Sequence, residues 1–173
     1  MCILLYMEKY IGSANIELDL DKCAYMLAAC ASLNLRKASR AITQMYDEAL
    51  KPAGLRSTQL PVLVTLVSTG QTTVNRLAED LVMDRTSLSR LLKPLVNQGL
   101  IEMAPGADRR TRELSVTRRG REMVAEAIPM WEGVQAQVVE RIGQNRWRDL
   151  IENLSAAAAI TPQYRPGFPG IHT

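Results

Sequence analysis

A short helical pattern, a turn and a longer helical pattern follow one another without a gap, and this succession limits the fold most. Thr73 is placed to cap a helix over residues 74–81, and two residues then form a turn. Asp84 is placed to cap a second helix over residues 85–98, which Gly99 ends. Two helices joined by about three residues predict a helix-turn-helix.

Two alternating segments come directly after this pair of helices. Residues 100–104 and 112–116 alternate apolar and polar side chains, and a polar, basic turn lies between them. Strand, turn and strand in this place predict a β-hairpin wing. The expected fold is therefore mainly α with a small β-hairpin wing, a winged helix-turn-helix.

Charge is concentrated in the same part of the chain. The whole chain has a net charge of +3, whereas residues 84–121 hold nine basic and four acidic residues, a net +5 that leaves −2 elsewhere. Eight of the nine basic residues are arginines, whose guanidinium groups suit phosphate and guanine. Charge alone leaves two interpretations of this block, a solvated charged face or a surface for a polyanion, and the helix-turn-helix beside it favours duplex DNA.

The second helix carries polar side chains on one face and leucines on the other. Leu88, Leu91, Leu92 and Leu95 are expected to face the core. The predicted DNA-binding residues are Thr73, Arg85, Thr86, Ser87, Ser89, Arg90 and Lys93, together with Asp108, Arg109, Arg110 and Arg112 on the wing. Asp108 is expected either to orient Arg110 through a charge-assisted hydrogen bond or to serve the turn alone.

The segment Leu20–Leu50 contains neither Gly nor Pro and repeats apolar residues at helical spacing. A single helix of this length would extend roughly 45 Å, more than a small domain covers, so it predicts packing on a second subunit. A helix capped by Ser57 is expected over 58–67. A further helix capped by Thr117 is expected to run to Ile142, and a final one over 145–159.

Five segments are expected from these patterns. They are an N-terminal extension (1–19), a dimerisation helix (20–54), the winged helix-turn-helix lobe (55–116), C-terminal dimerisation helices (117–160) and an irregular tail (161–173).

Six short sequences, in this order and spacing, resemble the MarR family of regulators. They are LRSTQ at 55–59, TVNRLA at 73–78, MDRTSLSR at 83–90, LVNQGLI at 95–101, DRR at 108–110 and LSVTRRG at 114–120. The resemblance covers residues 21–159 approximately. It implies a homodimer formed by the first and last helices that binds a pseudo-palindromic duplex DNA site, as a repressor released by a small ligand or an oxidant. It also implies a ligand pocket between the dimer helices and the DNA lobe, with candidates Tyr25, Met26, Leu66, Met130 and Trp131.

The cysteines leave an alternative open. Cys23 and Cys30 are the candidates for a thiol-based redox response. The resemblance to the peroxide-sensing branch of the family, however, places its sensing position at Ser32, two residues after Cys30. Small packing residues are the other interpretation of both cysteines.

Other classes of protein are less well supported. The only histidine is His172, in a segment rich in Pro and Gly, so no histidine-based catalytic set is expected, and there is no phosphate-binding or dinucleotide motif. We therefore expect no enzyme, no cofactor and no metal site. Three cysteines without a disulfide framework predict a cytoplasmic protein, and no apolar run is long enough to predict a membrane span. A winged helix that binds a protein instead of DNA stays an alternative.

Overall fold

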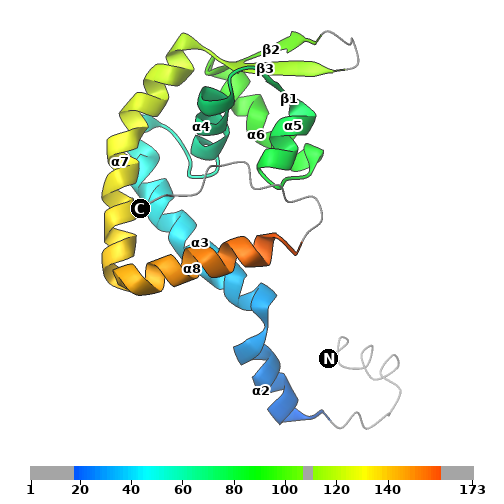
Figure 1. The fold of residues 1–173 in the computed structure, drawn as a ribbon, viewed down its shortest axis with the longest axis vertical. Helices are drawn as coiled ribbons and strands as arrows, with labels where there is room; N and C mark the ends of the chain where they lie inside the picture. The colour runs from blue at the N-terminus through cyan, green and yellow to red at the C-terminus, as the bar shows by residue number, and fades with distance from the viewer. Residues whose placement is uncertain (1–17, 107–110, 161–173) are drawn as a thin grey trace, which may run out of the picture. The chain divides into compact units, whose positions relative to one another are not determined.

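The computed structural model describes residues 18–106 and 111–160, and the chain divides into two compact units, 1–40 and 41–173. In chain order the elements are α2 (Leu20–Ala29), α3 (Ala31–Leu50), the 3-10 turn η1 (Lys51–Ala53), α4 (Leu60–Thr69), β1 (Thr72–Thr73), α5 (Val74–Asp80), α6 (Arg85–Asn97), β2 (Ile101–Pro105), β3 (Arg112–Val116), α7 (Arg118–Ile142) and α8 (Gln144–Ala158). Figure 1 labels them. Helices with a small sheet confirm the expected fold class.

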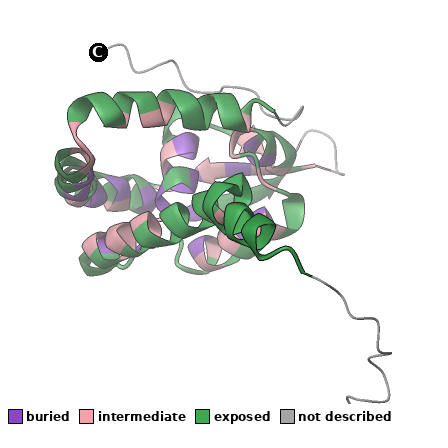
Figure 2. Ribbon diagram, turned by 90° about the horizontal axis from the view of Figure 1, so that it is seen from below, coloured by how far each residue is buried: buried purple, intermediate pink, exposed green. Residues whose placement is uncertain are grey.

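The first unit contains α2 and the beginning of α3, and the expected single helix over 20–50 is wrong. The chain leaves helical geometry at Cys30, where ψ is 111°. The side chain of Asn34 donates to the Ala28 carbonyl at 2.9 Å, near the end of α2, and to the Cys30 carbonyl at 3.1 Å, which also accepts the Asn34 main-chain N–H at 3.0 Å. No residue of α2 is buried, and Figure 2 shows it as a fully exposed helix.

The second unit is built around one hydrophobic core. Leucines from α4, α5 and α6 meet β-strand residues and the inner face of α7 in this cluster, where Leu63, Leu66 and Leu77 are fully buried. Leu88 and Leu95 of α6 are also fully buried and Leu92 nearly so, whereas Leu91 is partly exposed. The leucine face predicted for this helix therefore does lie in the core.

The sheet has three antiparallel strands in the order β1-β3-β2. The predicted hairpin is β2 and β3, in which Ile101 pairs with Val116 and Pro105 with Arg112. The third strand, β1, was not expected, and its two residues pair with Leu114 and Glu113. β1 directly precedes α5, so its pairing with β3 connects the start of α5 to the wing (Figure 1).

Hydrogen-bonding caps fix where three helices begin. Thr73 caps α5, Asp84 caps α6 and Thr117 caps α7, and each accepts the main-chain N–H of the third residue of its helix. All three caps were predicted. Gly99, with φ of 69°, ends α6 in the left-handed conformation, also as expected.

The expected cap of the α4 helix is wrong. This helix begins at Leu60 rather than at residue 58, and its N-cap position is Gln59. Ser57 instead donates its main-chain N–H to the Asp47 carboxylate at 2.7 Å, a contact between residues ten apart. A hydrogen bond to a residue distant in sequence thus decides the position of Ser57, against its local pattern as a helix cap.

No helix within the described ranges, 18–106 and 111–160, is long and apolar enough to cross a membrane. The same residues contain no cluster of three or more His, Cys, Asp or Glu side chains that would suit a metal ion.

Candidate nucleic-acid interface

A hollow with a volume of about 380 Å³ lies between the start of α5, the exposed face of α6 and the wing strands. Its lining residues are Thr73, Val74, Asn75, Arg85, Ser89, Leu92, Lys93, Val96, Asn97, Met103, Thr111 and Arg112. Five of the predicted DNA-binding residues, drawn from three separate elements, are therefore brought together at one concave surface.

Helical spacing explains which residues of α6 face this hollow. Arg85, Ser89 and Lys93 are four residues apart, so they lie in a row on one side of the helix. Leu92 and Val96 border the same row. Thr86, Ser87 and Arg90 are on neighbouring faces and do not line the hollow, although Thr86 and Arg90 are exposed.

The electrostatics of the hollow are one-sided. Arg85, Lys93 and Arg112 are its three cationic residues, and no carboxylate is among its lining residues. None of the three forms an ion pair with a carboxylate in the described parts of the chain. Exposed cations without partners keep their full attraction for phosphate, which is the chemistry of a polyanion surface.

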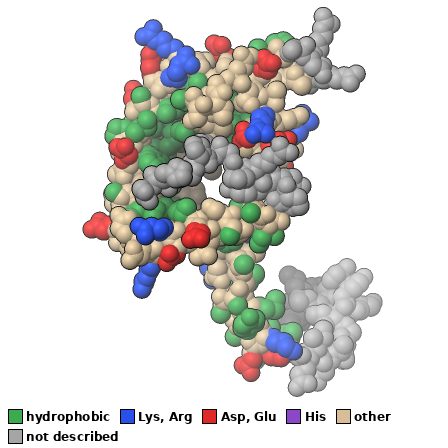
Figure 3. Space-filling view, in the orientation of Figure 1, with side chains coloured by type: hydrophobic (Ala, Val, Ile, Leu, Met, Phe, Trp, Pro, Cys, Tyr) green, Lys and Arg blue, Asp and Glu red, His purple; other side chains and the backbone are tan. Residues whose placement is uncertain are grey.

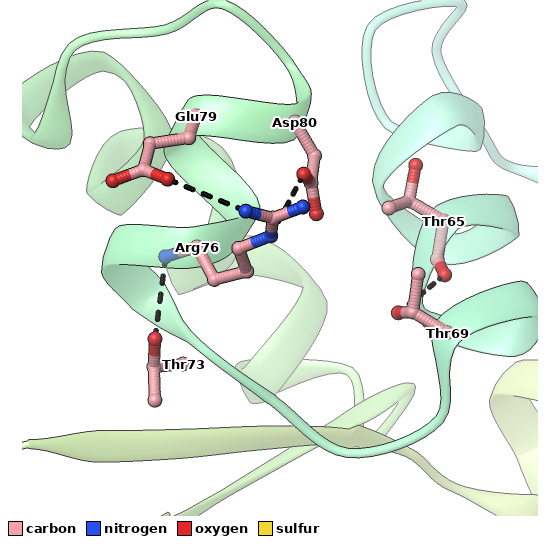
Figure 4. A network of polar contacts seen from close by, with 6 residues as sticks. All are labelled: Thr65, Thr69, Thr73, Arg76, Glu79 and Asp80. Atoms are coloured by element: carbon pink, nitrogen blue, oxygen red, sulfur yellow. Dashed lines mark hydrogen bonds and ion pairs between the residues drawn. The ribbon is translucent and has the colours of Figure 1, made fainter. Parts of the chain in front are cut away.

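Arg76, another arginine of the helix-turn-helix, is paired with carboxylates and does not line the hollow. Its guanidinium lies 3.1 Å from Asp80 and 3.7 Å from Glu79, between the two carboxylates (Figure 4). The Asp80 side chain is 92% buried by this contact and its surroundings, being only 8% exposed. Arg76 therefore stabilises α5 internally.

Hydroxyl groups of the site already hold the main chain in place. The Ser89 hydroxyl donates to the Arg85 carbonyl at 2.7 Å, and the Thr73 hydroxyl oxygen accepts the Arg76 N–H at 3.2 Å. Ser87 donates its N–H to the Asp84 carboxylate at 2.9 Å. The Thr73 hydroxyl keeps its hydrogen for a phosphate or a base edge, whereas the Ser89 hydroxyl has donated its hydrogen and can only accept.

The cap of α6 makes a pH-dependent contribution to stability. Hydrogen bonding by Ser87, first through its side chain and then through its N–H, holds the pKa of Asp84 below the ordinary 3.8. A carboxyl with a lowered folded-state pKa stabilises the fold above its unfolded pKa, and this contribution is lost as the pH falls through the folded value. We expect Asp84→Asn, which keeps a capping oxygen without the charge, to lose less stability than the wild type between pH 6 and pH 3.

Urea unfolding of both proteins at the two pH values measures this difference. Asp21 is a matched control, because it is an exposed acid in the first turn of α2 and is not the cap of that helix. If Asp84→Asn follows the wild type at both pH values, the Asp84 carboxylate contributes no stability through its charge.

Several predicted residues lie elsewhere. Asp108, Arg109 and Arg110 fall outside the described residues, so the expected Asp108–Arg110 contact is not placed. Cys23 and Cys30 are free and exposed, Cys23 within α2 and Cys30 at the break that follows it.

The five candidates for a ligand pocket do not share one cavity. Leu66 is fully buried in the core, and Met130 packs against it. Trp131 lines a second hollow, which is formed by α3, α4 and α7. Tyr25 and Met26 are 72% and 66% exposed on α2, in the first unit.

The structure adds residues that sequence reasoning missed. Asn75, Asn97 and Met103 line the basic hollow beside the predicted cations. Asn75, a polar residue in the first turn of α5, had the clearest signal, because the first turns of these helices face the same surface. Met103 had none, since its place depends on how β2 packs against α6.

Comparisons with known proteins agree with this geometry. A family model described as the MarR family matches residues 53–111. The M. tuberculosis transcriptional regulator MosR, solved in complex with DNA, is 37% identical over 76% of this chain and 97% of its own, with a TM-score of 0.68. A second MosR structure is 33% identical over 78% of this chain and 99% of its own, with a TM-score of 0.67.

More distant structures share the fold. A cysteine-to-serine variant of MarR from E. coli, complexed with operator DNA, is 18% identical over 77% of this chain and 96% of its own, with a TM-score of 0.70. The comparison with curated proteins found no match.

Proposed function

The chain belongs to the MarR family of winged helix-turn-helix transcriptional regulators, and on this basis we propose that it binds duplex DNA through the basic hollow and represses transcription. The observation that carries the proposal is the joining of Arg85, Lys93 and Arg112 on one surface without a carboxylate. A helix of this polarity enters the major groove with its N-terminal residues toward the bases, while the wing contacts the flanking backbone. The regulator bound to DNA in the MosR complex supports this use of the fold.

Homodimerisation is part of the proposal. Large apolar side chains of residues 18–35 are exposed, among them Leu20, Tyr25 and Leu27, and α2 has no buried residue. An isolated helix of ten residues is marginal in water, so α2 needs a surface to pack on. A second copy of this chain supplies that surface, and a two-fold dimer then binds two half-sites about one helical turn apart.

Control of DNA binding by a small ligand is also part of the proposal. The second hollow, with a volume of about 800 Å³, lies against α4 and α7, which also carry the core of the DNA lobe. A small molecule bound there would shift the lobe between states of different DNA affinity. The oxidant-sensing interpretation of Cys23 and Cys30 stays a prediction.

Salt dependence tests the DNA proposal. Fluorescence anisotropy with the chain's own upstream region, as a labelled duplex, is expected to show affinity that falls by roughly 10³-fold or more between 50 and 200 mM salt, for about six or more phosphate contacts. A scrambled duplex of equal length is the control and should bind more weakly by at least about 10²-fold. A DNA affinity that does not change with salt concentration, or no binding at 50 mM salt, would rule out the proposed DNA binding.

A further inference from the structure

The outer part of the wing extends beyond the residues that attach it to the core. Leu114 and Val116 of β3 are buried in the core, whereas Arg112, two residues further out, is exposed. β1 pairs with Leu114 and Glu113 and reaches no further along β3. The position of Arg112 in the basic hollow therefore depends on the contacts that are made near Glu113.

Arg112 and Glu113 lie on opposite faces of the sheet, because side chains alternate along a strand. Arg112 lines the basic hollow on one face, so Glu113 belongs to the other, which we call the outer face. Glu102 of β2 pairs with Ser115 and is on the outer face as well. Figure 3 shows acidic side chains over the wing strands, at the top of the view. The sheet thus has a cationic face toward the hollow and an acidic face away from it.

Gln71, directly before β1, reaches Glu113 on this outer face. One further step of the β1–β3 register puts Gln71 opposite Ser115 and therefore diagonal to Glu113, within reach of two long side chains. The side-chain amide of Gln71 donates to Oε2 of the Glu113 carboxylate. This hydrogen bond joins β3 to the segment that leads into α5.

The other oxygen of Glu113 faces the end of β2. A β-carbon at Gly106 would lie 3.3 Å from Oε1 of Glu113 and 3.4 Å from its Cγ, so glycine leaves room for this side chain. Gly106 also donates its N–H to the Thr111 carbonyl at 3.0 Å, which links the two sides of the hairpin. The Glu113 side chain therefore spans β3, from Gln71 on one side to the end of β2 on the other.

We propose that Glu113, held by Gln71, is a positioning residue that sets the angle of the wing and so places Arg112 in the basic hollow. The inference rests on the proposed DNA binding and adds a residue that acts on DNA only through its neighbour. An exposed polar pair contributes little to stability, so its effect is on the geometry of the wing. Its charge has the opposite effect, since a carboxylate near a DNA surface repels phosphate.

This opposition of sign separates position from charge. Glu113→Ala removes a negative charge, yet it should bind the upstream duplex on the order of tenfold more weakly, which is the size of one lost Arg112 contact. Glu102→Ala is the matched control, because it removes the same charge from the same face of the wing and should bind as tightly as the wild type or more tightly. Binding of a scrambled duplex should not weaken in either variant. Equal or tighter binding of the upstream duplex by Glu113→Ala overturns the proposal.

Exchanging the two partners tests the hydrogen bond itself. Gln71→Glu sets two carboxylates against each other and should weaken binding by on the order of tenfold. Combining Gln71→Glu with Glu113→Gln restores a donor and an acceptor at the wild-type net charge, and this double variant should bind within about twofold of the wild type. A double variant as weak as Gln71→Glu contradicts the role of the contact.

A measurement without DNA separates this inference from the proposed function. Amide hydrogen exchange in β2 and β3 should be faster in Glu113→Ala than in Glu102→Ala, while exchange in α4 stays the same. Urea unfolding should give both variants nearly the stability of the wild type. A wild type that does not bind DNA contradicts the proposed function. A wild type that binds DNA, with wing exchange unchanged in Glu113→Ala, contradicts only the role of Glu113.

Discussion

The double variant Arg85→Gln and Lys93→Gln is expected to bind duplex DNA about 100-fold more weakly than the wild type. Both side chains lie in one row on α6, line the basic hollow and have no carboxylate partner in the described chain. Each lost contact to phosphate or guanine costs on the order of tenfold in affinity. If both contact phosphate, the slope of log affinity against log salt should also decrease by about 2.

The control must remove the same charge elsewhere. Arg141→Gln with Arg146→Gln also lowers the net charge by two, at exposed residues at the end of α7 and the beginning of α8. Anisotropy titrations at several salt concentrations compare the two double variants, and circular dichroism checks that both are folded. Equal losses in the two variants would mean that general charge, and not the surface on α6, governs binding.

The elements near this surface were predictable because their signals are local. Thr73, Asp84 and Thr117 are capping residues directly before helical patterns, and Gly99 directly follows one, so these four boundaries could be predicted from local pattern alone. β3 was predictable in the same way, because its buried residues, Leu114 and Val116, alternate with more exposed ones. The two residues of β1 are too few to show any period, so this strand was missed.

The errors occurred where a distant or weak interaction decides the local structure. Nothing in composition marks the break at Cys30, because apolar spacing continues across it. Ser57 has the local pattern of a helix cap, but its N–H is bonded to Asp47 of α3. Likewise, the predicted cations could be named from sequence, whereas the hollow that Arg85, Lys93 and Arg112 share depends on how α6 and β3 pack.

Gly120→Ala is expected to lower the stability of the chain by about 2 to 3 kcal/mol. Gly120 is buried in the first turn of α7, and a β-carbon there would lie 2.2 Å from the Leu100 carbonyl oxygen and 2.6 Å from Val116. The Leu100 carbonyl cannot retreat easily, because it accepts the Thr117 N–H at 3.0 Å, and the Thr117 hydroxyl holds the neighbouring Gly99 carbonyl at 2.7 Å. Overpacking against main chain therefore outweighs the gain of about 1 kcal/mol in helix propensity.

Gly133→Ala is the matched control in the same helix. A β-carbon at Gly133 meets nothing within 4 Å, so the substitution should raise stability by up to about 1 kcal/mol through helix propensity alone. Urea unfolding gives the free energy of both variants, and the two changes are expected to have opposite signs. Gly120 packs against Leu100, just before β2, and against Val116 of β3. Gly120→Ala should therefore also displace the wing and weaken DNA binding. A Gly120→Ala protein as stable as the wild type would show that this junction is not close-packed.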